Sequence, residues 1–256
     1  LLLLFSCNAD PAQEKPVTVK APQDVNKIAG EQIKKIAESG LSDSLLIIGK
    51  DTLVTFSYIP KLMPQDFSTF WTDKGKLSAN GDTLFNIIKN ARHYALFKED
   101  YHASSLDSLV NGFYDKGKDE YNAGNIAKAE WLMYDACLKF GAHLNKGRFY
   151  PDSLFLEWKP SKIKVDWVNT IVNGVKSNQL RKAYESLEPK QEGYVFLRNE
   201  FRKYIYDKEV MDYDSIPQNL SDKTPEFKEK LIARLKKTGE YDSTLSGSDS
   251  VQLTKA

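Results

Sequence analysis

The chain has 256 residues, a formal net charge of +1, 28% charged residues and 41% hydrophobic residues. This near-neutral balance gives no electrostatic reason to expect nucleic acid as a partner. The hydrophobic content is sufficient for a folded core, and the length fits one large domain or two small ones.

The first seven residues, LLLLFSC, are apolar up to a cysteine, Cys7. The run is far shorter than the ~20 residues that a membrane-spanning helix requires. Leu4–Cys7 is similar to a bacterial lipobox, with an apolar residue three positions before the cysteine and a small residue just before it. We therefore interpret residues 1–6 as the end of a truncated lipoprotein signal peptide. Cys7 would then carry the lipid that anchors the protein to a membrane; the alternative is a chance apolar terminus.

Residues 7–23 contain several prolines and little to bury, which is typical of a flexible tether. If Cys7 is lipidated, the one other cysteine, Cys137, can form no intrachain disulfide. Cys137 lies on the apolar side of a predicted helix, between Met133 and Phe140. We expect it to be a small buried hydrophobic residue and not a reactive thiolate.

The folded part is expected to begin near residue 24 with a helix over 26–39. Two β-branched runs around Gly49-Lys50-Asp51 predict a short β-hairpin near 45–58, which we expect to be the only β structure. A phosphate-binding loop is the alternative there, but G-x-x-x-x-G-K-[ST] is missing. Apolar residues at helical spacing predict the remaining helices, over 81–96, 104–114, 162–175, 179–187, 191–206 and 225–238.

The longest periodic segment predicts a central helix over about 126–146. Asn125 is the expected N-cap, and Gly147 is expected to end the helix with a positive φ. Apolar residues cover most of its circumference, so other elements should surround it. Its polar residues fall into one narrow stripe: Lys128, Asp135, Lys139, His143 and Lys146. The predicted fold class is mainly α, an irregular multi-helix domain around one long helix.

The histidines His93, His102 and His143 are widely spaced, with no H-E-x-x-H and no cysteine at zinc spacing. We expect His102 to form a local hydrogen bond in the turn after Asp100. His143 is expected to be exposed to solvent.

On the predicted polar stripe, Asp135 is expected to pair with Lys139 at the helix surface. Glu185 and Glu188 are interpreted as a helix end and not as a catalytic carboxylate pair. No G-x-S-x-G occurs. The residues therefore predict no catalytic residue, no metal site and no cofactor.

Several segments, in order, resemble the scaffold domain of large bacterial L,D-transpeptidases, the enzymes that cross-link peptidoglycan. The resemblance spans roughly residues 56–241, most of the chain. It rests on Phe70-Trp71, Asp82–His102, the central helix through Asn145–Phe149, Leu156–Trp158, Leu187–Pro189 with Tyr194 and Leu197, Leu231–Leu235 and Gly239–Tyr241.

The resemblance implies a scaffold over 24–241, followed in the family by a peptidoglycan-binding-like module and a catalytic domain. The catalytic domain carries a cysteine nucleophile in Ser-His-Gly-Cys-x-Arg. This chain lacks that motif and should be inactive alone, and residues 242–256 resemble a linker leading into the missing module. The expected setting is the periplasmic side of the cell envelope, with peptidoglycan as partner through the missing domains. The alternative is a stand-alone helical envelope lipoprotein that binds a protein partner or peptidoglycan without catalysis.

Arg148 is the candidate interaction residue, because it follows the carbonyl end of the central helix, where a cation is favoured. One interpretation is an arginine that caps its own helix and pairs with Asp152 or Glu157. The other is a guanidinium group that reaches a carboxylate outside this domain, on a stem peptide or on the catalytic module.

Overall fold

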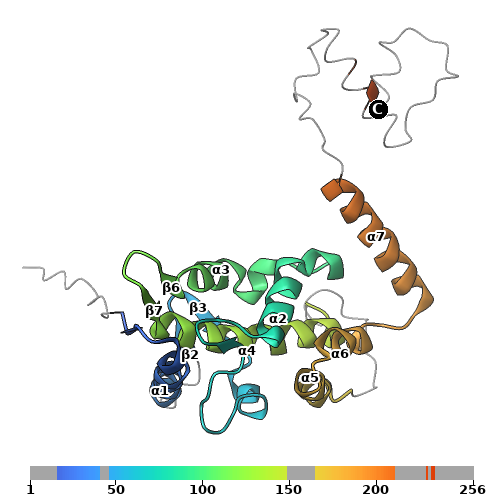
Figure 1. Cartoon of the computed structure of the whole chain (residues 1–256). Helices are drawn as coiled ribbons and strands as arrows, with labels where there is room; N and C mark the ends of the chain where they lie inside the picture. The colour runs from blue at the N-terminus through green and yellow to red at the C-terminus, as the bar shows by residue number, and fades with distance from the viewer. Residues whose placement is uncertain (1–15, 41–45, 149–164, 211–228, 230–231, 234–256) are drawn as a thin grey trace, which may run out of the picture. The chain divides into compact units, whose positions relative to one another are not determined.

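Helices make up most of the described chain in a computed structural model (Figure 1). The structure describes residues 16–40, 46–148, 165–210, 229 and 232–233. The predictions for Cys7, for the linker at 242–256 and for most of the helix at 225–238 lie outside these residues. The chain divides into two compact units, the first ending at Arg198 and the second beginning at Asn199.

The central helix of the first unit, α4, runs from Ala123 to Lys146. It begins three residues earlier than expected, because the side chain of Asn122 accepts a hydrogen bond from the backbone N–H of Asn125 at 3.0 Å. Asn122, and not Asn125, is therefore the N-cap. The predicted end is confirmed, since Gly147 has a φ of 83° and follows the last helical residue.

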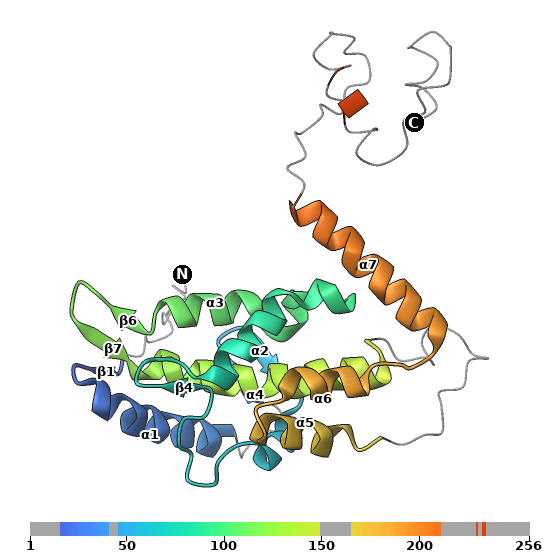
Figure 2. The same cartoon turned by 45° about the vertical axis from the view of Figure 1, so that its right-hand side comes forward.

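Five further helices lie around α4, as Figures 1 and 2 show. In both views α2 and α3 lie on one side of α4, and α1 and α5 lie on the other. The predicted mainly α fold around one long helix is therefore confirmed. The helices are α1 (Pro22–Gly40), α2 (Ala79–Lys89), α3 (Ala103–Asn111), α5 (Trp167–Lys176) and α6 (Leu180–Leu187).

Three short segments of 3-10 helix occur in the part of the chain that the structure describes, and one of them replaces the end of the helix predicted over 81–96. The helix expected over 81–96 ends at Lys89, and Ala95 follows in a left-handed conformation, with φ of 54°. The 3-10 segments are η1 (Phe56–Lys61), η2 (Ala91–Tyr94) and η3 (Lys98–Tyr101). Among the described residues, no helix combines the length and the apolar character needed to cross a membrane.

The predicted hairpin is confirmed as the antiparallel pair β2 (Leu46–Ile48) and β3 (Asp51–Leu53), with Leu46 opposite Leu53. The expectation that it is the only β structure was wrong. The other strands have two or three residues each, too few to show an alternating pattern. They are β1 (Thr18–Val19), β7 (Glu120–Asn122) and β6 (Tyr114–Asp115), in sheet order β1-β7-β6, and the pair β4 (Thr72–Asp73) and β5 (Lys76–Leu77).

The second unit contains the end of α7, a helix from Glu192 to Val210 that begins in the first unit. Residues 229, 232 and 233 are also helical. The helix predicted over 191–206 is therefore confirmed and extends four residues further.

Candidate functional site

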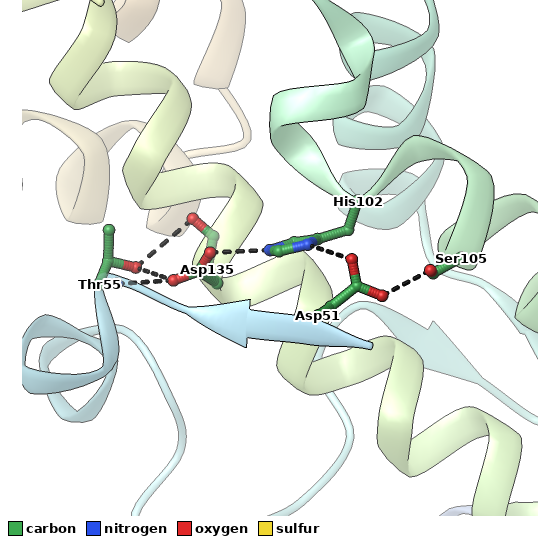
Figure 3. Close-up of polar contacts among 5 residues, drawn as sticks. All are labelled: Asp51, Thr55, His102, Ser105 and Asp135. Carbon is green, nitrogen blue, oxygen red and sulfur yellow. Dashed lines mark hydrogen bonds and ion pairs between the residues drawn. The ribbon is translucent and has the colours of Figure 1, made fainter. Parts of the chain in front are cut away.

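A chain of buried and partly buried polar side chains joins three elements of the first unit (Figure 3). At its centre is His102, which precedes α3. Its Nδ1 lies 2.9 Å from Oδ1 of Asp51 in β3, and its Nε2 lies 2.8 Å from Oδ2 of Asp135 in α4. We call these three residues with Thr55 and Ser105 the His102 network. It links the hairpin, the start of α3 and the central helix.

In each carboxylate, the oxygen that does not face His102 accepts a hydrogen bond from a hydroxyl group. Ser105 donates to Oδ2 of Asp51 at 2.5 Å. On the other side of the imidazole, Oδ1 of Asp135 accepts from the backbone N–H of Thr55 at 2.7 Å and from its hydroxyl at 2.8 Å. All four carboxylate oxygens therefore have a donor.

The geometry of the His102 network favours a doubly protonated imidazole, because each ring nitrogen faces a carboxylate oxygen and an ionised carboxylate only accepts. Burial on its own would lower the pKa of His102, but the hydrogen bonds from its ring to Asp135 and Asp51 raise that pKa above its ordinary value. For Asp51, burial on its own would raise the pKa. The hydrogen bonds from Ser105 and His102 outweigh this effect, so the pKa of Asp51 lies below its ordinary value.

The backbone of His102 is held in a conformation that non-glycine residues rarely adopt, with φ of 59° and ψ of 24°. Its carbonyl accepts from the N–H of Leu106 at 2.8 Å, while its side chain does not cap α3. The left-handed turn instead aims the ring inward, between Asp51 and Asp135. Such strain persists where surrounding contacts over-determine it.

A second buried carboxylate, Glu130 of α4, holds the segment that leads into β4. It accepts hydrogen bonds from the backbone N–H groups of Phe70 and Trp71 at 3.2 Å and of Thr72 at 2.8 Å. The hydroxyl of Thr72 donates at 2.7 Å. Burial raises the pKa of Glu130 to about 7, although these four donors act to lower it.

Arg148 lies past the end of α4 and binds a carboxylate within the first unit. Its Nε lies 2.5 Å from Oδ2 of Asp100, its Nη2 lies 3.2 Å from Oδ1, and its guanidinium lies over the ring of Phe97. The hydrogen bond from Arg148 lowers the pKa of Asp100. The predicted partners Asp152 and Glu157 lie outside the described residues. A carboxylate from elsewhere would have to compete with Asp100 for the guanidinium group.

Comparison with known proteins shows the family to which the chain belongs. Residues 64–201, more than half of the chain, match a family model described as a scaffold domain. The chain belongs to the scaffold-domain family. No curated protein and no solved structure was found to match the sequence. The matched range includes His102, Ser105 and Asp135 of the network, as well as Glu130 and Arg148.

The polar groups of this scaffold domain are arranged for holding elements together. Both ring nitrogens of His102 face carboxylates, so neither offers a lone pair to act as a general base, and Ser105 faces Asp51 instead of the ring. Within the described ranges, no group of three or more potential metal ligands occurs. Cys137 is fully buried as predicted, and burial raises the pKa of its thiol to about 12.

Sequence reasoning missed the partners in this scaffold domain. Asp135, expected on the surface beside Lys139, is fully buried and bonded to His102. His102 does not bond locally after Asp100. His143 is half-buried, with Nδ1 2.8 Å from the hydroxyl of Tyr101. One available signal was Glu130, a carboxylate set between Ala129 and Trp131 in an otherwise apolar stretch.

Titration of Glu130 is expected to change stability near neutral pH. A raised folded-state pKa means that its contribution is complete below the ordinary pKa of glutamate and is lost as pH rises through about 7. The free energy of unfolding of the wild type, relative to Glu130→Gln, should fall by about 3 kcal/mol between roughly pH 4.5 and pH 7. Urea titrations at several pH values measure the difference. Glu99→Gln, at an exposed glutamate, is the control and should show no such trend. If the difference in unfolding free energy between the wild type and Glu130→Gln stays constant with pH, Glu130 does not titrate in this window.

Proposed function

We propose that this chain is the non-catalytic scaffold of a lipid-anchored L,D-transpeptidase that acts in peptidoglycan cross-linking at the cell envelope. The observation that carries the proposal is the scaffold-domain match over residues 64–201. Most of the segments that resemble L,D-transpeptidase scaffolds fall inside this range: Phe70-Trp71, Asp82–His102, α4 with Gly147-Arg148, and Leu187–Pro189 with Tyr194 and Leu197.

The chemistry of the described residues favours a structural role over a catalytic one. The enzyme family works through a cysteine thiolate beside a histidine. Here Cys137 is buried, and its thiol contacts the hydroxyl of Tyr184 at 3.4 Å instead of a histidine. The buried His102 network and Glu130 tie loops and strands to α4, which suits a rigid platform for a separate catalytic module.

The test is the activity of the protein encoded by the complete reading frame that contains this chain. We expect that frame to encode a Ser-His-Gly-Cys-x-Arg motif, and the purified protein to convert disaccharide-tetrapeptides into cross-linked dimers detectable by mass spectrometry. Replacing the cysteine of that motif with alanine should abolish the dimers, and the 256-residue chain alone should form none.

The same protein offers a second readout for the anchor. Cells grown with a clickable fatty acid should label the wild type and leave Cys7→Ser unlabelled. A complete reading frame without the motif, whose product forms no dimers, would contradict the transpeptidase assignment and favour a binding lipoprotein. Equal labelling of the wild type and Cys7→Ser would contradict the lipid anchor alone.

A further inference from the structure

The two carboxylates that hold His102 differ in burial, and therefore in how easily each can lose its hydrogen bond from the ring. Asp135 is fully buried, whereas 15% of the side-chain surface of Asp51 is exposed. Asp135 comes from the middle of α4, and Asp51 is the first residue of β3, next to the turn of the hairpin. One side of the ring is therefore fixed in the core, and the other faces an element near the surface.

A neutral imidazole has one N–H and one bare nitrogen. In the His102 network, the bare nitrogen would direct its lone pair at a carboxylate oxygen less than 3 Å away, which is repulsive. The remaining proton belongs on Nε2, because His102 is the partner of Oδ2 of Asp135 and this carboxylate is fully buried, where water cannot replace the lost donor. The contact that is lost is the one between Nδ1 and Asp51, whose carboxylate keeps Ser105 and can reach solvent.

The surroundings of the ring contain few other charges. Among the described residues, the charged groups that act on His102 are Asp135 from α4 and Asp51 from β3, while α3 contributes the hydroxyl of Ser105. Burial raises the pKa of Asp51, and the hydrogen bonds from Ser105 and His102 lower it; Lys50, in the hairpin turn, adds a smaller effect in the lowering direction. The proton on His102 therefore decides whether Asp51 is attracted or repelled.

The part of the hairpin that depends on this contact is its tip. Asp51 is the strand partner of Ile48, and the two flank the Gly49-Lys50 turn. At the other end of the hairpin, Leu46 and Leu53 are both buried in the core and hold the base in place. Ile48 is also buried in the core, so loss of the Asp51 contact would loosen the Asp51 side of the tip without unfolding the hairpin.

We propose that the Asp51–His102 contact is a proton-operated latch: it holds the tip of the β2–β3 hairpin against the imidazole while the ring carries both protons. When one proton is lost, the tip separates from the ring, and the Asp51 side chain keeps the Ser105 hydrogen bond. Because the hydrogen bonds to Asp135 and Asp51 raise the pKa of His102 against the opposing effect of burial, the latch opens at a higher pH than the ordinary pKa of histidine would set. This regulation of the hairpin goes beyond the proposed function and does not depend on it.

The test combines two NMR measurements on the whole 256-residue chain over a pH series. The ¹⁵N shifts of the His102 ring report when it loses a proton, and amide protection factors, corrected for the intrinsic pH dependence of exchange, report opening of the hairpin. We expect the protection of the paired residues Ile48 and Asp51 to fall about tenfold as His102 deprotonates, since a charge-assisted hydrogen bond is lost. Protection in the β6–β7 hairpin should not change.

Asp51→Asn separates the latch from general loosening at high pH. An asparagine can accept from a protonated ring and donate to a neutral one, so protection at the hairpin tip should no longer follow the charge of His102. Asp115→Asn, a matched change in the β6–β7 hairpin, should leave the wild-type response intact. The proposal is overturned if tip protection stays constant while His102 deprotonates, if it falls while the ring remains doubly protonated, or if Asp51→Asn keeps the wild-type response.

Discussion

Replacing Asp135 with alanine is expected to lower the free energy of unfolding by about 3–5 kcal/mol, because it removes one partner from a buried ion pair. The change leaves Nε2 of His102 and the backbone N–H of Thr55 without their acceptor in the core, and it leaves the Thr55 hydroxyl only the backbone carbonyl of residue 135, at 3.5 Å. Each buried donor left unpaired costs free energy that no water can recover. Urea unfolding of the variant beside the wild type measures the loss.

The loss in Asp135→Ala should depend on pH in a defined direction. A raised folded-state pKa of His102 means that its contribution is complete below the ordinary histidine pKa and disappears as pH rises through the raised value. The variant should therefore lose more at about pH 6 than at about pH 9. Asp107→Ala, at an exposed aspartate of α3, is the matched control and should change stability by about 0.5 kcal/mol or less.

A double-mutant cycle with His102→Ala tests whether the two residues act as one unit. Once His102 is absent, the removal of Asp135 should cost clearly less than it does in the wild type, because one of the unpaired donors is already missing. Additive losses would show that His102 and Asp135 do not act as one unit. A loss in Asp135→Ala no larger than in Asp107→Ala would show that Asp135 does not stabilise the fold.

The long helices could be predicted from sequence because their apolar residues recur over many turns. The end of α4 was predicted correctly at Gly147, because the position after the last helical residue often has a positive φ, which glycine adopts most easily. The start was misplaced because Asn122 and Asn125 are equally good N-cap residues by type. Short strands such as β4 and β6 give no period at all, so their pairing depends on tertiary contacts.

The His102 network could not be predicted because its members are far apart in sequence. Asp51 and His102 are separated by 51 positions, and Thr55 and Asp135 by 80. A helical wheel places Asp135 at an angle on α4, but it does not say what packs against that angle. For a helix surrounded on nearly all sides, a polar residue at any angle can be buried, so exposure on the predicted stripe was the wrong inference for Asp135.

The aromatic centre of the core depends on Phe140 of α4. Its side chain is fully buried, and its ring contacts those of Tyr94, Tyr101 and Tyr184 at centroid distances of 5.3, 4.8 and 4.9 Å. These rings come from η2, η3 and α6, so one side chain on α4 joins three separate elements. A cavity at this position cannot be closed by the movement of a single neighbour.

Phe140→Ala is therefore expected to cost about 3–5 kcal/mol of unfolding free energy, the range for a large-to-small change at a buried aromatic residue. Lys139→Ala, one position away on the predicted polar stripe, should change stability by about 0.5 kcal/mol or less. Both variants keep the helix propensity of α4 high, because alanine is the best helix former, so the comparison isolates packing. Denaturant melts that show similar losses for the two would contradict the central place of Phe140 in the core, and a small loss in both would indicate that the rings around it can close the cavity.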